Sequence, residues 1–336
     1  MPDKSASNNR YDLFSSSFKA DPFPTYAQMR TESPIYAHIA PDGQTIWYIT
    51  RYDDVIAVLK DDENFVKNSA NIAPEIGIES GQSATPARQA INQNMLFSDP
   101  PHHTRLRTLI NQAFTSRRID QMAPNIQIIA DTLLDQATKQ TEMDIIADYA
   151  LPLPVIVICD MLGIPSEDRD LVSGWSQAII SPGRHNLGYG ARRRTMKAFL
   201  GYLRQIFTQR RQQPKDDLIT ALIQAEPTTG DKLSEEELSS MVALLLVTGH
   251  ETTVNLIGNG VLALLQNPSE RQKLQNDPAS IEATVEELLR FDGPVETSTT
   301  RWAKQDMMFK GHSIERGDII RVVLSSANRD EAKFDK

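Results

Sequence analysis

The chain has 336 residues with 35 basic and 44 acidic side chains, and its net charge of −9 disfavours nucleic acid as the main partner. Cys159 is the single cysteine, which excludes an intramolecular disulfide and a cysteine-based zinc cluster. The polar N-terminal sequence lacks the apolar region of a signal peptide, so we expect a cytoplasmic protein with no membrane-spanning segment.

The first predicted elements are a β-hairpin and a helix. Ile35–Ala40 and Thr45–Arg51 are rich in β-branched and aromatic residues and flank a Pro-Asp-Gly turn. A helix is predicted from Tyr52 to Lys60. The stretch Asn68–Pro101 contains glycine and proline and has no clear period, which predicts a long irregular loop, functional or disordered.

Helical periodicity dominates the middle of the chain, and short β-like pieces follow Pro294. The predicted helices are His102–Thr115, Ile119–Thr138, Leu151–Leu162, Ser166–Ile180, Arg192–Gln212, Asp216–Ala225, Ser234–Gln266, Ser269–Gln275 and Ala279–Arg290. The predicted strands near the end are Thr297–Ala303, Met307–Ile314 and Ile319–Leu324. This pattern predicts a mainly α fold with small β-sheets. Because no repeat or composition shift marks a linker, we expect one domain over residues 1–336.

The most informative helix, Met241–Leu265, is apolar but has a polar centre at Gly249–Thr253. A membrane span is disfavoured by the polar residues in its middle. Two interpretations remain: a core helix with a bent, water-satisfied centre, or a helix that crosses an active site with a widened groove at Gly249–Thr252. The density of polar groups favours the second, because buried acids and hydroxyls cost free energy unless they are paired or used. Glu251 and Thr252 form an acid–alcohol pair that could relay protons into a closed pocket.

A second motif lies at the start of the helix that follows the long loop. His103 and Arg107 are four residues apart, on one helical face just after Pro100-Pro101. Such a pair suits an anionic carboxylate or phosphate group. The alternative is a solvated basic face shared with Arg105 and Arg118.

Two further motifs lie near the end of the chain. Glu287 and Arg290 are three residues apart, a spacing that by itself favours an exposed pair. The Pro294-Val295 turn ends the helix soon afterwards and could bury the pair as a structural clamp. Arg301, in the extended stretch beyond, could reach the same anion as His103 and Arg107.

Together, and in this order, the motifs resemble the cytochrome P-450, or haem-thiolate monooxygenase, superfamily in its soluble bacterial form. The oxygen-binding helix of that family carries (Ala/Gly)-Gly-x-(Glu/Asp)-Thr, which Thr248–Thr252 matches. Its Glu-x-x-Arg helix is matched by Glu287 and Arg290. The resemblance covers nearly the whole chain and implies the cytochrome P-450 fold.

The resemblance also implies the cofactor, haem (iron protoporphyrin IX). It assigns cofactor binding to His103 and Arg107, which would grip a propionate, and to Gly249 and Arg301. The stretch Ser326–Asp330 is similar to the segment that leads into the proximal loops of the family. No residue of this chain is expected to bind the iron itself.

Two departures from the family pattern matter. Thr248 stands where the family usually has Ala or Gly, and would crowd or hydrogen-bond what binds on the haem face. The sequence ends at Lys336, before the family's thiolate-cysteine loop, so we expect a fragment, incomplete at the C-terminus and inactive, of a monooxygenase parent. Cys159 is not expected to substitute, because it lies in an apolar helix. A haem-less remnant that acts as a binding or scaffold protein is the alternative.

For the intact parent, the resemblance implies insertion of one oxygen atom from O₂ into an apolar organic substrate, with Glu251 and Thr252 in proton delivery. Electrons would come from a soluble ferredoxin or flavodoxin with its reductase. The residues expected to line the substrate pocket are Val247, Thr248, Val295 and Thr297, together with Ile72, Ile76, Ile78, Met95 and Leu96.

Overall fold

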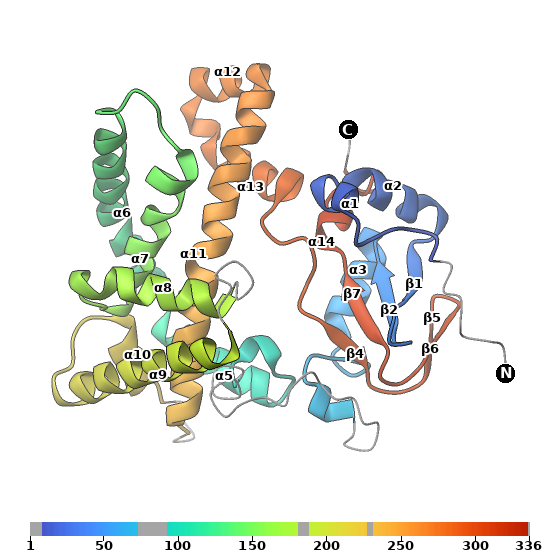
Figure 1. The fold of residues 1–336 in the computed structure, drawn as a ribbon, viewed down its shortest axis with the longest axis horizontal. Coiled ribbons are helices and arrows are strands. Elements are labelled where there is room, and N and C mark those ends of the chain that lie inside the picture. Colours follow the sequence, from blue (N-terminus) through green and yellow to red (C-terminus); the bar gives the residue numbers. More distant parts are fainter. Residues whose placement is uncertain (1–8, 73–92, 181–187, 227–230, 335–336) are drawn as a thin grey trace. The chain divides into compact units, whose positions relative to one another are not determined.

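The computed structural model of the protein describes residues 9–72, 93–180, 188–226 and 231–334. They form two compact units, Met1–Gly81 with Asn259–Lys336, and Gln82–Gly258. Helix α11 (Glu235–Gln266) belongs to both units, because the boundary between Gly258 and Asn259 falls inside it (Figure 1). The single domain expected over residues 1–336 therefore stays a prediction.

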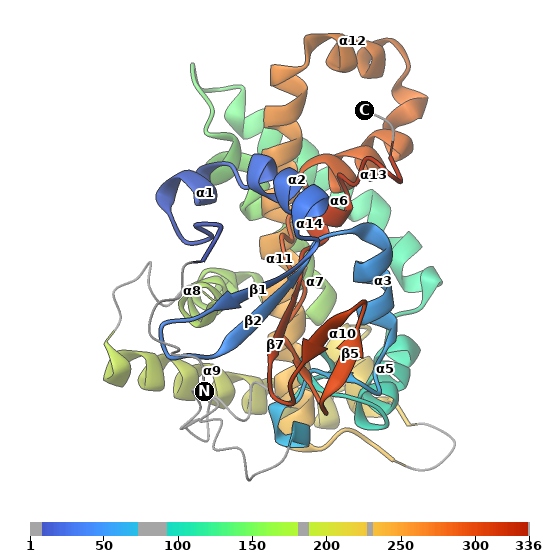
Figure 2. The ribbon, with the colours of Figure 1, turned by 90° about the vertical axis from the view of Figure 1, so that its right-hand side faces the viewer.

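A five-stranded sheet, in the order β1-β2-β7-β4-β3, organises the first unit. Its strands are β1 (Ile35–Ile39), β2 (Thr45–Ile49), β3 (Phe65–Val66), β4 (Arg301–Ala303) and β7 (Ile319–Val322). The predicted hairpin is confirmed, since β1 and β2 pair antiparallel with Ile35 opposite Ile49. Strand β7 pairs parallel to β2, so a C-terminal strand lies beside the N-terminal hairpin (Figure 2). Strands β5 (Met307–Phe309) and β6 (His312–Ile314) form a separate two-stranded sheet.

The first unit also contains helical segments among its described residues. They are α1 (Ser16–Ala20), α2 (Phe23–Glu32), α3 (Tyr52–Lys60), η6 (Pro278–Ser280), α12 (Pro268–Asn276), α13 (Ile281–Asp292) and α14 (Leu324–Ala327). Helix α3 has the predicted bounds. Helices α1, α2 and α14 were not predicted, because two are at most five residues long and α2 is only weakly amphipathic. Both α2 and α3 pack on α14, which joins the two ends of the chain within one core.

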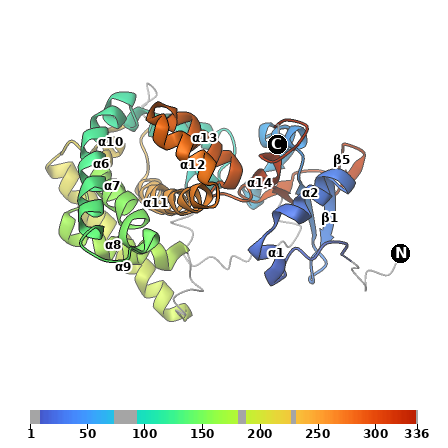
Figure 3. The same cartoon turned by 90° about the horizontal axis from the view of Figure 1, so that it is seen from above.

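The second unit is helical. Its elements are η3 (Met95–Phe97), α5 (His102–Ala113), α6 (Ser116–Ala137), the π-helical turn η4 (Ile145–Ala150), α7 (Pro152–Leu162), η5 (Ser166–Asp168), α8 (Arg169–Ile180), α9 (Tyr189–Gln212), α10 (Leu218–Gln224) and the first part of α11. The predicted helices are confirmed with ends shifted by a few residues. Helix α6 begins earlier than predicted because the Thr115 side chain accepts the Arg118 amide as an N-cap. Helices α6 and α7 pack together, as do α8 and α9 (Figure 3).

The core of the second unit is built around α9 and α11. Phe199, Leu203 and Phe207 of α9 lie in one buried cluster with Met241 and Val242 of α11. Two helical stretches, Ile145–Leu162 and Glu235–Gln266, are long and apolar enough to cross a membrane. Some of their apolar residues, among them Ile158, Leu162 and Met241, belong to this buried cluster.

The predicted loop Asn68–Pro101 is described only at its ends. These contain η1 (Ser69–Ile72) and η3, and residues 73–92, which include Ile76 and Ile78, lie outside the described part of the chain.

Candidate functional site

Helix α11 runs without a break through the polar centre of the sequence. Thr248 Oγ1 donates to Leu244 O at 2.8 Å, and Thr252 Oγ1 donates to Thr248 O at 2.9 Å. Each hydroxyl therefore bonds to the carbonyl one turn back, which satisfies it inside the helix. The widened groove expected at Gly249–Thr252 does not interrupt the helical pattern.

The other polar residues of this centre point to different surroundings. His250 is buried, with Nδ1 2.5 Å from Leu246 O, and behaves as a satisfied core histidine. Glu251 is half-buried, and in the part of the chain that the structure describes its carboxylate has no hydrogen bond or ion pair. Glu251 and the adjacent half-buried Thr252 are therefore the two side chains of this helix that could transfer a proton, since Glu251 has no partner among the described residues.

Gly249 has a packing role within the second unit. A Cβ added there would lie 3.0 Å from Ile158 Cδ1 and 3.1 Å from its Cγ1, so α7 approaches α11 too closely for a larger residue without adjustment. Contact of Gly249 with a cofactor stays a prediction.

On α5, the basic side chains have separate environments. Arg105 donates to Glu237 at 2.7 Å and also binds Asp231, and these hydrogen bonds raise its pKa and lower that of Asp231. Arg118, which lies on the following helix α6, donates to Asp216 at 2.9 Å. Arg105 and Arg118 are therefore paired with acidic side chains, and the choice between an anion site and a solvated basic face stays a prediction. Arg107 is exposed and has no ion pair within the described residues.

This environment fits the carboxylate of a haem propionate. Among the residues that the structure describes, the guanidinium of Arg107 has no acidic partner, and His103 lies one turn before it on the same helix. Both belong to the second unit, like Glu251 and Thr252, whereas Arg301 belongs to the first. Whether Arg301 reaches the same anion stays a prediction.

Arg301 opens strand β4 and is buried. Its Nη1 donates to Ser298 Oγ at 2.9 Å and to Thr299 O at 3.4 Å, and its backbone pairs with Ile320 of β7. The sheet therefore sets the position of this guanidinium.

Glu287 and Arg290, the predicted pair on α13, form a bidentate ion pair. Arg290 Nε and Nη2 donate to the two carboxylate oxygens of Glu287 at 2.7 and 2.6 Å, and these bonds lower the pKa of Glu287. Arg290 Nη1 donates to Asn328 O at 2.7 Å, so the pair ties α13 to the segment after α14. The pair is not buried, since the Glu287 side chain is 56% exposed, so the exposure that the spacing favoured is found together with a bond that the spacing does not reveal.

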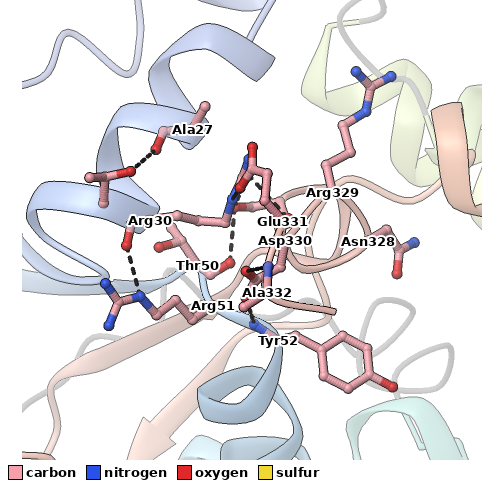
Figure 4. A network of polar contacts seen from close by, with 12 residues as sticks. Ala27, Arg30, Thr50, Arg51, Tyr52, Asn328, Arg329, Asp330, Glu331 and Ala332 are labelled. Atoms are coloured by element: carbon pink, nitrogen blue, oxygen red, sulfur yellow. Dashed lines mark hydrogen bonds and ion pairs between the residues drawn. The ribbon is translucent and has the colours of Figure 1, made fainter. Parts of the chain in front are cut away.

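The stretch Ser326–Asp330 is itself held by residues that the sequence did not single out. Arg30 of α2 donates to Ser326 O at 3.2 Å and pairs with Glu331 at 3.0 Å (Figure 4). Buried Asp330 accepts the Tyr52 amide at 2.9 Å (Figure 4). No local signal could have revealed these partners, because about 300 residues separate them (301 between Arg30 and Glu331).

The expected substrate residues differ in exposure. Val247 and Thr297 are half-buried, Thr248 is exposed, and Val295 is 44% exposed. Ile72 is fully buried, and Met95 and Leu96 pack against the core of the second unit.

Cys159 does not have the environment of an iron ligand. It is buried in the core of the second unit, and burial raises its pKa to about 11. At neutral pH it is a thiol, whereas a metal ligand must be a thiolate.

Comparisons with known proteins identify relatives of this chain. A family model described as cytochrome P-450 matches residues 182–336. The vitamin D(3) 25-hydroxylase of Pseudonocardia autotrophica is 40% identical over 321 residues, which are 96% of this chain and 77% of the relative. The polyketide biosynthesis cytochrome P-450 PksS of Bacillus subtilis is 42% identical over 323 residues, 95% of this chain and 78% of the relative.

Solved structures show the same likeness. The PksS structure of the Bacillus subtilis bacillaene polyketide synthase matches with a TM-score of 0.89 and 40% identity, over 97% of this chain and 80% of that one. A myxobacterial cytochrome P-450, CYP267B1, in complex with myristic acid matches with a TM-score of 0.84 and 38% identity, over 96% and 80%.

Proposed function

This chain belongs to the cytochrome P-450 family, and on that premise we propose that it serves a haem-dependent monooxygenase that inserts one oxygen atom from O₂ into an apolar organic substrate. The observation that carries the proposal is the pair Glu251 and Thr252 in the middle of α11. It combines a carboxylate that has no partner among the described residues with a hydroxyl one position along the helix.

When bound, haem supplies the chemistry of oxygen activation. The chain supplies the surroundings. His103 and Arg107 would hold an anionic edge of the cofactor, and Arg301 is proposed as a further cofactor-binding residue. The exposed guanidinium of Arg107 supports this role.

Proton delivery falls to α11. Thr252 Oγ1 donates its hydrogen to Thr248 O, so its lone pairs are free to accept one from water. Glu251, without a cationic partner, can take up a proton from solvent and release it toward that hydroxyl. Apolar neighbours such as Val247 exclude bulk water from the pocket side.

We propose a small lipid-like or polyketide-like substrate, bound near Val247, Thr248, Val295 and Thr297. Support comes from the relatives, whose names refer to vitamin D(3) hydroxylation and polyketide biosynthesis. Electrons would come from a soluble ferredoxin or flavodoxin with its reductase, in the cytoplasm. Because Cys159 is a buried thiol, we also propose that it does not bind the iron.

Replacing Thr252 with Ala tests the proton-delivery role. In the haem-loaded protein with its redox partner, product per reducing equivalent should fall by roughly tenfold or more, since general acid–base groups contribute about 10²–10⁴-fold. Haem content should stay unchanged. Thr253→Ala, which removes an exposed hydroxyl next along the helix, is the control. Equal coupling in both variants would exclude the relay.

A further inference from the structure

We propose that a hydrogen bond between Tyr26 and Glu296, here called the Tyr26–Glu296 clasp, positions the substrate-facing stretch Val295–Thr297 and so sets which carbon of a substrate is oxidised. Tyr26 lies in α2, and its hydroxyl donates to Glu296 Oε1 at 2.6 Å. The two residues are 270 positions apart and belong to the same unit. The inference rests on the proposed function, because it takes Val295 and Thr297 as substrate contacts.

The backbone around Glu296 is fastened on one side to the β7–α14 segment. Glu296 O accepts the Ser325 amide at 3.1 Å, and Ser298 N donates to Val322 O at 2.9 Å. Between them, Thr297 forms an isolated antiparallel bridge with Val323. These backbone hydrogen bonds fix the position of residues 296–298 relative to β7 and the start of α14.

Glycine is required on the N-terminal side of the stretch. A Cβ added at Gly293 would lie 2.3 Å from Leu289 O, so a larger residue would displace the chain where it leaves α13. Val295 follows after one proline. Its position therefore depends on Gly293 behind it and on Glu296 ahead of it.

Tyr26 is the fixed partner of the clasp. Its side chain is 1% exposed, and its ring packs edge-on against Phe18 with ring centres 5.4 Å apart. Burial, and next the hydrogen bond to Glu296, raise the pKa of Tyr26, so its hydroxyl remains a donor throughout the physiological range. A close-packed ring cannot move easily, and the more exposed Glu296 must adapt to it.

Glu296 is thus held at two points, its carbonyl by Ser325 and its carboxylate by Tyr26. Its neighbour Val295 keeps an exposed side chain at a set position. A small displacement of such a contact changes the geometry between a bound substrate and the oxidising centre, to which rates are sensitive. Loss of the clasp should therefore alter the distribution of products more than the stability of the fold.

The chain offers a matched set of variants. Tyr26→Phe removes the donor, Glu296→Ala removes the acceptor, and Glu296→Gln keeps an oxygen that can accept the same bond. Tyr11→Phe is the control, because the Tyr11 hydroxyl is buried in the same cluster but has no hydrogen-bond partner among the described residues.

The first measurement is amide hydrogen exchange of residues 293–300, which needs no haem. Tyr26→Phe and Glu296→Ala should speed exchange at Ser298 by roughly tenfold, the size expected for a hydrogen bond to a charged group. Glu296→Gln and Tyr11→Phe should leave it near the native rate. Unchanged exchange in Tyr26→Phe would overturn the clasp.

The second measurement is the ratio of products hydroxylated at different carbons of myristic acid, in the haem-loaded protein with its redox partner. Tyr26→Phe should shift the ratio severalfold, and Glu296→Gln should restore it. Faster exchange with an unchanged ratio would overturn the positioning role. A native protein that binds haem but gives no oxygenated product would count against the proposed function, while the exchange experiment still decides the clasp.

Discussion

At the scale of single residues, Arg210 and Asp217 form an ion pair that is buried in the second unit. The two side chains are about 5% and 4% exposed, and Arg210 Nε lies 2.5 Å from Asp217 Oδ2. Arg210 Nη2 donates to Gly163 O at 2.6 Å, and Asp217 Oδ1 accepts the Thr220 amide at 2.8 Å. The pair therefore joins the end of α7, the end of α9 and the start of α10.

Asp217→Asn should lower the free energy of unfolding by about 3–5 kcal/mol, because it leaves the Arg210 charge buried and uncompensated. Urea denaturation followed by circular dichroism measures the change. The adjacent Asp216→Asn is the control: its side chain is 91% exposed, and the loss should be below about 1 kcal/mol. Similar losses in both variants would contradict the assignment.

The thiol of Cys159 gives a prediction about pH. Burial raises its pKa from 9.0 to about 11, so the folded state favours the protonated form. The contribution of the protonated thiol to the free energy of unfolding is fully present below pH 9 and is lost as the pH rises through 11. The difference in unfolding free energy between the native protein and Cys159→Ala should therefore narrow across that interval, as measured by urea denaturation at pH 8 and pH 10.5.

Iodoacetamide provides an independent check on the same thiol. At pH 8 the folded chain should react slowly and the urea-unfolded chain quickly, since the thiolate is the nucleophile and burial blocks access. Equal rates would show that Cys159 is an accessible thiolate and would reopen its candidacy as an iron ligand.

At the scale of elements, α11 combines a core helix with the helix centre for which we propose a role in proton delivery. Its first half supplies buried residues such as Met241 and Val242, whereas its centre carries Glu251 and Thr252. Gly249 lets α7 approach at this point, through Ile158. The close contact supports a core role for this part of α11, and the active-site interpretation stays a prediction.

Gly249→Ala should be less favourable than Gly201→Ala by about 1–3 kcal/mol, the usual cost of overpacking. A Cβ at Gly201 of α9 meets nothing within 4 Å, so that change should stabilise the helix by about 0.5–1 kcal/mol. Thermal unfolding of the two variants measures the difference. If both changes are equally stabilising, the approach of α7 is looser than described here.

Most of the long helices and the hairpin could be predicted from the sequence, because helical periodicity and the residues that favour a hairpin are local properties of the chain. The predicted hairpin and α3 are confirmed. Elements that depend on tertiary contacts were missed, among them α2, β3 and α14. A two-residue strand such as β3 has no periodicity to detect and exists through its pairing with β4.

At the scale of the whole molecule, the two compact units share α11. A continuous helix that contributes to both should make their unfolding one cooperative event. The fluorescence of the three tryptophans can follow each unit separately. Trp175 lies in the second unit, and Trp47 and Trp302 lie in the first.

Urea unfolding should therefore give the same midpoint in Trp175→Phe, which reports on the first unit, and in the double variant Trp47→Phe and Trp302→Phe, which reports on the second. Tryptophan fluorescence is the measurement, and circular dichroism provides the midpoint for the whole chain in each variant. Midpoints that differ between fluorescence and circular dichroism would show two independent domains and contradict the single domain expected from composition.

By itself, the sequence determined the helical class, the family, and the short-range pairs such as Glu287 with Arg290, because these depend on spacing along one element. Only the tertiary structure decided which partner completes each group: Asn328 for Arg290, Asp217 for Arg210, Glu296 for Tyr26 and Ile158 for Gly249. The physical reason is that burial and hydrogen bonding between distant segments depend on how elements pack, and the periodicity of one segment carries no information about the surface that will cover it.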